Sequence, residues 1–271
     1  MTWNLRIIYS GNKVEIYKVN DYNIKTGITR ETKDNKKSGL KLRRKKEINS
    51  KNRRRSHLTT IRNNIIRLAE CNNSKFKSFI TLTYNKDVTE EENTKYLNLF
   101  FTKIKKKCKD LSYIWVLERT EKGRIHVHLL TSLDFPLCTA KSNERKTEEH
   151  KLQEQKLEKI WSYNRKNLGW VDIRSIDKDQ CRKYSLYLAT YLNKSMYITE
   201  IEKQKHLYGY SRRNLNKPIE EKYETNVGIE QVIKDFIADY DLKFTDSYDI
   251  NYENNQSVAT VTYLDFYKRR E

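Results

Sequence analysis

The segment Glu121–Leu130, EKGRIHVHLL, decides how the middle of this chain folds. It places two of the five histidines, His126 and His128, one residue apart in an apolar run. Residues two apart on a β-strand share a face, so both imidazoles point the same way, about 7 Å apart along the backbone. Two imidazoles on one face can share a metal ion, whereas a pair that only packs in a sheet donates hydrogen bonds to carbonyls.

The surrounding segment YIWVLERTEKGRIHVHLLTS, residues 113–132, predicts a β-hairpin that turns around Gly123. A three-residue loop with Gly123 in the left-handed conformation places Glu118 opposite His126. A carboxylate facing an imidazole on an otherwise apolar wall supplies a third ligand, because a buried charge there must be compensated. A two-residue loop would turn Glu118 to the opposite face and leave Glu121 as the fallback ligand.

Glu118, His126 and His128 together predict a divalent-metal site. Two ring nitrogens, one carboxylate oxygen and open coordination positions suit Mg²⁺ or Mn²⁺, with a substrate phosphate completing the shell. The imidazoles favour Mn²⁺ of the two, and Zn²⁺ remains an alternative.

A second constellation lies in KYSLYLATYLNKS, residues 183–195, which predicts a helix. Helical spacing puts one stripe of phenols and an amine beside an apolar stripe, with the polar stripe formed by Tyr184, Tyr187, Tyr191 and Lys194. Most tyrosines on amphipathic helices are core residues. A lysine one turn away from a phenol favours the phenolate and can also hold a phosphate, which predicts a reactive tyrosine.

The rest of the chain mixes strands and helices without the regular alternation of a parallel sheet, which predicts an α+β fold with a central antiparallel sheet. We expect the histidine hairpin in the middle of that sheet, the tyrosine helix across one face and other helices behind. The expected domains are a basic N-terminal extension, a catalytic domain and an acidic C-terminal extension, at 1–75, 76–218 and 219–271. Further expected elements are a hairpin at 2–19, strands at 79–84, 169–175 and 257–267, and helices that begin near Thr89, Glu144 and Asp177.

The charge balance points to a polyanionic partner. The chain carries 55 Lys and Arg against 36 Asp and Glu, a formal net charge of +19, and such a field attracts nucleic acid before any specific contact forms. Basic residues gather between Lys41 and Arg67. The predicted DNA-binding residues are Arg53, Arg54, Arg55, Arg124, Arg212 and Arg213.

The cysteines and the apolar runs exclude several classes of protein. Four widely spaced cysteines without a CxxC pair indicate neither a zinc ribbon nor a disulfide framework. No apolar run reaches the ~20 residues of a membrane span. We therefore expect a cytoplasmic protein without a membrane partner.

Four segments in this order resemble motifs I, II and III of the HUH endonucleases, and most closely the rolling-circle replication initiators of plasmids and single-stranded phages. They are FITLTY, GRIHVHLL, WSYNRKNLGWVDIRSI and YLATYLNK, and they span Phe79 to Lys194. The two-tyrosine YxxxYxxK segment is most similar to the gene A replication proteins of small icosahedral phages. The chain departs from this pattern at Thr190, where relatives often carry a lysine.

The resemblance implies a metal-assisted tyrosine nuclease with an RRM-like sheet. His126 and His128 match the metal ligands, Tyr191 with Lys194 matches YxxK, and Tyr187 matches the first tyrosine of the pair. Because Thr190 leaves Tyr187 without its own YxxK, we expect Tyr191 to attack first. Attack on an origin phosphodiester would leave a covalent 5′-phosphotyrosine and a free 3′-OH.

The expected partner is single-stranded or extruded origin DNA, with a host helicase and DNA polymerase for unwinding and synthesis. Two other functions are compatible with the motifs. An HUH transposase acting on single-stranded ends shares the chemistry and motif order, and a non-catalytic single-strand binding module would keep the fold without the reaction.

Overall fold

The computed structural model describes most of the chain, namely residues 2–20, 24–25, 59–120, 122–138, 145–162, 168–198, 207–252 and 256–269. The chain divides into two compact units. The central unit comprises Arg53–Asn216, and the terminal unit combines Met1–Asn52 with Lys217–Glu271. Each unit contains a five-stranded antiparallel sheet with helices, so the predicted α+β class is confirmed.

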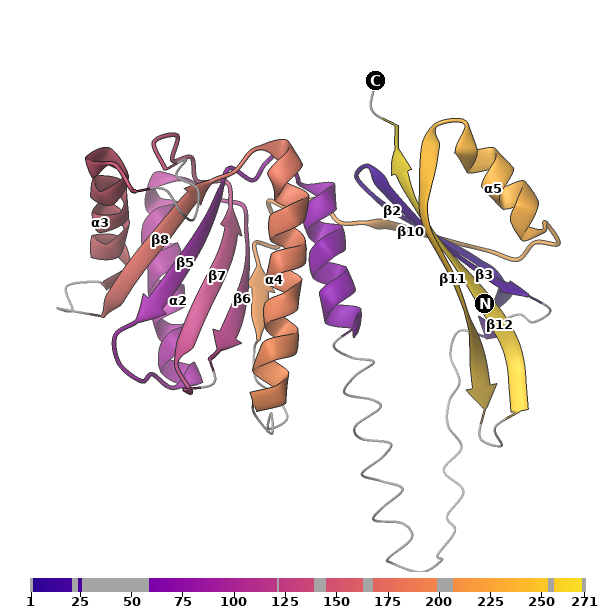
Figure 1. The fold of residues 1–271 in the computed structure, drawn as a ribbon, viewed down its shortest axis with the longest axis horizontal. Helices are drawn as coiled ribbons and strands as arrows, with labels where there is room; N and C mark the ends of the chain where they lie inside the picture. The colour runs from indigo at the N-terminus through magenta and orange to yellow at the C-terminus, as the bar shows by residue number, and fades with distance from the viewer. Residues whose placement is uncertain are drawn as a thin grey trace, which may run out of the picture. The chain divides into compact units, whose positions relative to one another are not determined.

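The sheet of the central unit has the strand order β8-β5-β7-β6-β9 (Figure 1). All its neighbouring strands are antiparallel. The strands are β5 (Ser78–Tyr84), β6 (Tyr113–Arg119), β7 (Ile125–Thr131), β8 (Gly169–Ser175) and β9 (Tyr208–Tyr210). The strand that carries both histidines, β7, lies in the middle of the sheet, as the sequence predicts.

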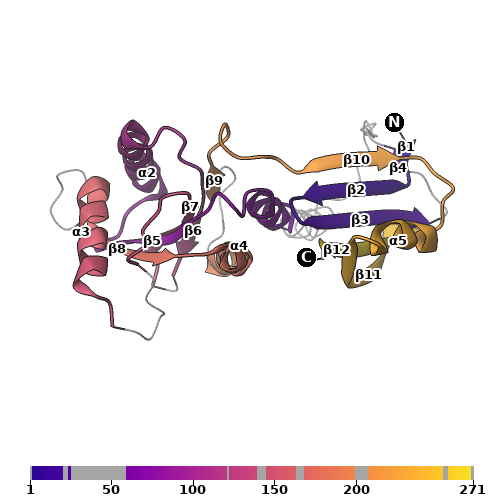
Figure 2. The ribbon, with the colours of Figure 1, turned by 90° about the horizontal axis from the view of Figure 1, so that it is seen from above.

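Helices cover both faces of this sheet (Figure 2). One face packs against α2 (Glu90–Lys107) and α3 (Glu148–Ser162), whose apolar residues share a core with Leu82 and Val127. The other face packs against α4 (Lys178–Ile198) and the helix over residues 59–71. Because side chains alternate along a strand, the residues between those of the first core point toward α4.

The boundaries of α2 follow from local chemistry. Thr89 Oγ1 accepts from Glu92 N at 3.1 Å, and Glu92 Oε2 accepts from Thr89 N at 2.9 Å, which is the predicted capping box. Acidic residues fill the first turn and lysines fill the last, in accord with the helix dipole.

The terminal unit is built from both ends of the chain. Its sheet has the order β10-β2-β3-β12-β11, so β2 and β3 of the predicted N-terminal hairpin pair with strands near the C-terminus. The sequence predicts extensions at 1–75 and 219–271, and the structure places parts of both in one sheet. The elements are β2 (Leu5–Ser10), β3 (Lys13–Asn20), β10 (Ile219–Tyr223), α5 (Ile229–Ile237), β11 (Tyr240–Tyr252) and β12 (Gln256–Lys268), with a small separate pair of strands, β1 (Thr2–Trp3) and β4 (Ile24–Lys25).

The core of the terminal unit lies between its sheet and α5. Val14, Ile16 and Phe266 are buried there together with Val232 of the helix. Within the described residues of both units, no helix has the length and apolar character needed to cross a membrane.

Candidate metal centre and tyrosine site

The histidine hairpin has the predicted register. Glu118 pairs with His126, and beyond the last strand pair Thr120 N donates to Arg124 O at 2.9 Å. Gly123 takes a positive φ of 82° and donates its N–H to Thr120 O at 2.9 Å, which closes the three-residue loop. A residue with a Cβ would be strained at that φ. The fallback ligand, Glu121, lies outside the described residues.

The three predicted ligands converge. One ligand atom each from Glu118, His126 and His128 lies within 4.8 Å of the others. Within this group Glu118 Oε2 accepts from His128 Nε2 at 2.9 Å, so the carboxylate reaches diagonally past its cross-strand partner. Two nitrogens and a carboxylate at this spacing fit a divalent cation, which would take the place of the proton between Glu118 and His128.

Thr81 of β5 orients the buried ring of His128. The two residues are cross-strand partners, and Thr81 Oγ1 lies 3.2 Å from His128 Nδ1. Since the Nε2–H of His128 donates to Glu118, Nδ1 accepts from the Thr81 hydroxyl. Partners of this kind fix the ring orientation and tautomer of metal-ligating histidines.

His126 is kept neutral by its surroundings. Burial is the main cause that lowers the pKa of His126 below its usual value, with smaller contributions from His128 and Arg124. The negative charge of Glu118 opposes these effects. The neutral imidazole is the form that binds a metal.

Tyr191 lies directly against the triad. Its ring stacks on the ring of His128 with centroids 3.7 Å apart and an interplanar angle of 9°. Only 5% of Tyr191 is exposed. Burial raises the pKa of Tyr191 strongly, and its hydrogen bond with Tyr187 and the charge of Glu118 raise it further. The phenol is therefore held in its protonated form.

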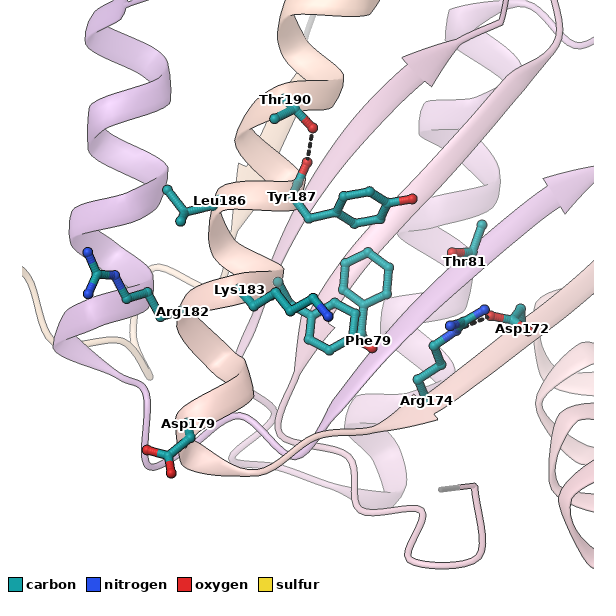
Figure 3. A pocket seen from close by; sticks show the side chains of 11 residues that line it. Phe79, Thr81, Asp172, Arg174, Asp179, Arg182, Lys183, Leu186, Tyr187 and Thr190 are labelled. Carbon is teal, nitrogen blue, oxygen red and sulfur yellow. Dashed lines mark hydrogen bonds and ion pairs between the residues drawn. The ribbon is translucent and has the colours of Figure 1, made fainter. Parts of the chain in front are cut away.

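Tyr187, one turn earlier on α4, is the exposed member of the pair. It is 47% exposed and meets the ring of Tyr191 edge-on, with centroids 4.6 Å apart. The close-up shows it reaching across the sheet from α4 (Figure 3). Lys194 belongs to the same helix, but its side chain is not among those that the structure describes.

A pocket of about 770 Å³ lies beside the triad, between α4 and strands β5 and β8. Its lining includes the aromatic rings of Phe79, Tyr184 and Tyr187 and the cations Arg174 and Lys183. The sequence analysis identifies neither Phe79, Thr81 nor Arg174 as a site residue. The alternation of β5 puts Phe79 and Thr81 on one face, but only the cross-strand pairing shows that this is the histidine face.

The predicted DNA-binding residues fall in different places. Arg124 is exposed at the hairpin end, near His126. Arg212 and Arg213 are exposed just after β9, whose last residue pairs with Ile114 at the start of β6. Glu118 lies near the other end of β6, so these two arginines are not brought to the triad. Arg53, Arg54 and Arg55 lie outside the described residues.

Comparison with known proteins links the central unit to replication. Residues 77–196 match a family model described as a replication-associated protein of the ORF2 type. The matched range includes β5, both strands of the histidine hairpin and most of α4. Searches of curated proteins and of solved structures found no significant match. The similarity associates residues 77–196 with replication proteins and does not extend to the terminal unit.

Proposed function

We propose that this protein is a replication initiator that nicks single-stranded DNA at an origin and later rejoins the strands, as in rolling-circle replication. The observation that carries the proposal is the stacking of Tyr191 on His128, because it puts a phenol beside three converging metal ligands. The similarity of residues 77–196 to replication-associated proteins supports the same function.

The proposed reaction is a transesterification at phosphorus. The phenol oxygen of a tyrosine on α4 attacks the phosphodiester, the phenol loses its proton, and the bond to the 3′-oxygen breaks. The products are a 5′-phosphotyrosine and a 3′-OH, which takes up a proton. Glu118, His126 and His128 would hold a Mn²⁺ or Mg²⁺ ion, which when bound polarises the scissile phosphate.

Two observations bear on which tyrosine attacks. The contact with His128 and the YxxK spacing favour Tyr191, whereas the exposure of Tyr187 makes its phenol easier for a strand to reach. We assign the first attack to Tyr191 and the rejoining step to Tyr187. Because only 5% of Tyr191 is exposed, this order requires the stacked ring to become accessible when DNA binds.

The test is a denaturant-resistant protein–DNA adduct formed with a single-stranded, origin-type oligonucleotide and Mn²⁺. We expect Tyr191→Phe to abolish the adduct and Tyr187→Phe to retain it. Tyr263→Phe is the matched control, since Tyr263 is also a phenol whose pKa is raised by burial beside a carboxylate, but it belongs to the terminal unit.

The outcomes separate the alternatives. An adduct that survives Tyr191→Phe but is lost in Tyr187→Phe would reverse the order of the tyrosines. Absence of an adduct with any divalent metal, while the strand still binds, would replace the nuclease by a single-strand binding module. In the proposed function, a host helicase and polymerase supply unwinding and synthesis.

A further inference from the structure

The pocket beside the triad has an aromatic wall. The ring of Phe79 stacks on that of Tyr184 with centroids 4.8 Å apart and an angle of 28°. Tyr187 leans on the same ring at 5.8 Å and 54°. These rings come from β5 and from two successive turns of α4, and Figure 3 shows Phe79 and Tyr187 facing the same space. Stacked and tilted rings at an open pocket form a surface on which a nucleobase can stack.

The opposite side of the pocket carries an arginine held in place by other charges. Arg174 Nε donates to Asp172 Oδ2 at 3.2 Å, and Lys146 Nζ donates to Asp172 Oδ1 at 2.7 Å. Lys146 also donates to Glu154 of α3 at 2.6 Å, which ties this chain of charges to a helix. The guanidinium is thereby oriented before any ligand arrives.

Arg174 keeps hydrogen-bonding capacity for an anion. A guanidinium has five N–H donors in a planar fork, and Asp172 is bound through Nε. The hydroxyl of Tyr184 also bonds to Arg174, which links the cation to the aromatic wall. A fixed fork of donors suits a phosphate better than a flexible ammonium group does. Lys183 lines the same pocket and adds a second positive charge.

We propose that this pocket binds one nucleotide of the single strand next to the scissile bond, with its base on the Phe79–Tyr184–Tyr187 wall and its phosphate on Arg174. The volume of about 770 Å³ lies in the range of pockets that enclose small organic ligands. Tyr187 belongs both to this wall and to the tyrosine pair, so a nucleotide here would hold its neighbouring phosphate close to the phenols. The position relative to the scissile bond rests on the proposed function, whereas the pocket's affinity for a strand does not.

The first test separates phosphate binding from general electrostatic attraction. Fluorescence anisotropy in EDTA measures the binding of an oligonucleotide of about 12 thymidines and of an abasic strand of equal length, both within the ~4–16 nucleotides that single-strand sites cover. We expect Arg174→Gln to weaken binding of both strands about tenfold and to reduce the dependence of log K on log salt by about 0.7. Arg269→Gln, which breaks a similar Nε–carboxylate pair in the terminal unit, should leave both quantities unchanged.

The second test isolates base stacking. We expect Tyr184→Leu to weaken binding of the thymidine strand about fivefold to tenfold and to leave binding of the abasic strand unchanged. Tyr248→Leu is the matched control, because Tyr248 is an exposed tyrosine of the terminal unit. Retained amide-exchange protection of β5 and β7 in Tyr184→Leu shows that the unit still folds.

The proposal is overturned if Arg174→Gln binds both strands like the unaltered protein, or if Tyr184→Leu weakens both strands equally. Displacement of the thymidine strand by thymidine 5′-monophosphate, at concentrations below the strand's own dissociation constant, would assign the pocket to free nucleotides instead. All these measurements omit metal and cleavage. Failure to form a covalent adduct would therefore overturn the nuclease and leave the pocket standing, and the reverse result is equally readable.

Discussion

The central and terminal units each bury a phenol beside a carboxylate on a five-stranded antiparallel sheet. In the terminal unit, Tyr263 donates to Glu15 at 3.1 Å, and burial, followed by the charge of Glu15, raises the pKa of Tyr263. In the central unit, burial, the hydrogen bond with Tyr187 and the charge of Glu118 raise the pKa of Tyr191. A shifted phenol next to an acid therefore does not by itself mark a reactive tyrosine.

The units differ in what surrounds the carboxylate. Glu15 lies 3.6 Å from Lys13, which also lies 3.3 Å from Asp265, so the charges of the terminal sheet compensate one another. Glu118 instead meets two imidazoles whose ligand atoms converge with its own. Among the described residues, this is the one such group of potential metal ligands. Mutual compensation stabilises a fold, whereas convergent lone pairs create a demand for a cation.

Removing one carboxylate from each sheet gives the largest contrast. We expect Glu118→Gln to lower Mn²⁺ affinity about 100-fold, since it removes a charged ligand from the triad. Glu15→Gln should leave Mn²⁺ affinity unchanged, because its carboxylate serves Lys13 and Tyr263. Isothermal titration of each full-length variant with MnCl₂ measures both. Equal losses of affinity in the two variants would erase the distinction between the sheets.

Removing the shared cation of the terminal sheet should affect stability alone. Lys13→Met leaves Glu15 and Asp265 buried without their common lysine, and we expect a loss of about 2 kcal/mol in local stability. Hydrogen exchange followed by mass spectrometry should show lower protection in β3 peptides and none of this loss in β7. Lys243→Met, which breaks an exposed pair with Asp241, is the control and should change little.

Local features of the central unit were predictable from sequence. The loop around Gly123 and the alternation of its flanking strands fix the register that pairs Glu118 with His126, since both signals lie within one hairpin. The capping box at Thr89 and Glu92 likewise marks the start of α2. Spacing also put Tyr187 and Tyr191 on one stripe of a helix.

Features that depend on contacts distant in sequence were not predictable. The stripe on α4 does not reveal that Tyr191 is 5% exposed and Tyr187 47%, because this depends on which turn of the helix lies over β7. The partner of His128, Thr81, is set by strand pairing across many residues. Pairing of β3 with β12 joins the two ends of the chain with no local signal at either end.

Thr81→Val tests whether the surroundings of the imidazoles matter as the ligands do. Loss of the hydroxyl that contacts His128 Nδ1 frees the ring to change tautomer and orientation, and we expect Mn²⁺ affinity to fall about tenfold. Thr102→Val provides a control, because the Thr102 hydroxyl bonds only within its own helix, to Asn98 O. An unchanged affinity in Thr81→Val would mean that Glu118 alone orients the ring.

Lys146→Met applies the stability test to compensated charges inside the central unit. Lys146 holds Asp172 and Glu154, and its removal should cost about 1 kcal/mol in local stability at pH 7. Burial acts to raise the pKa of Asp172, but the bonds from Lys146 and Arg174 outweigh it and hold that pKa below its usual value.

The sign of the pH dependence follows from that lowered pKa. Asp172 contributes stability above its unfolded pKa and loses the contribution as the pH falls through the lower folded value. The difference between Lys146→Met and the unaltered protein should thus persist at pH 5 and shrink below about pH 4. Amide exchange in β8 at several pH values measures it, with Lys151→Met as the exposed control on α3. A difference that grows toward low pH would mean that Lys146 acts through packing, and the paired charges at Asp172 would then not resemble those of the terminal sheet.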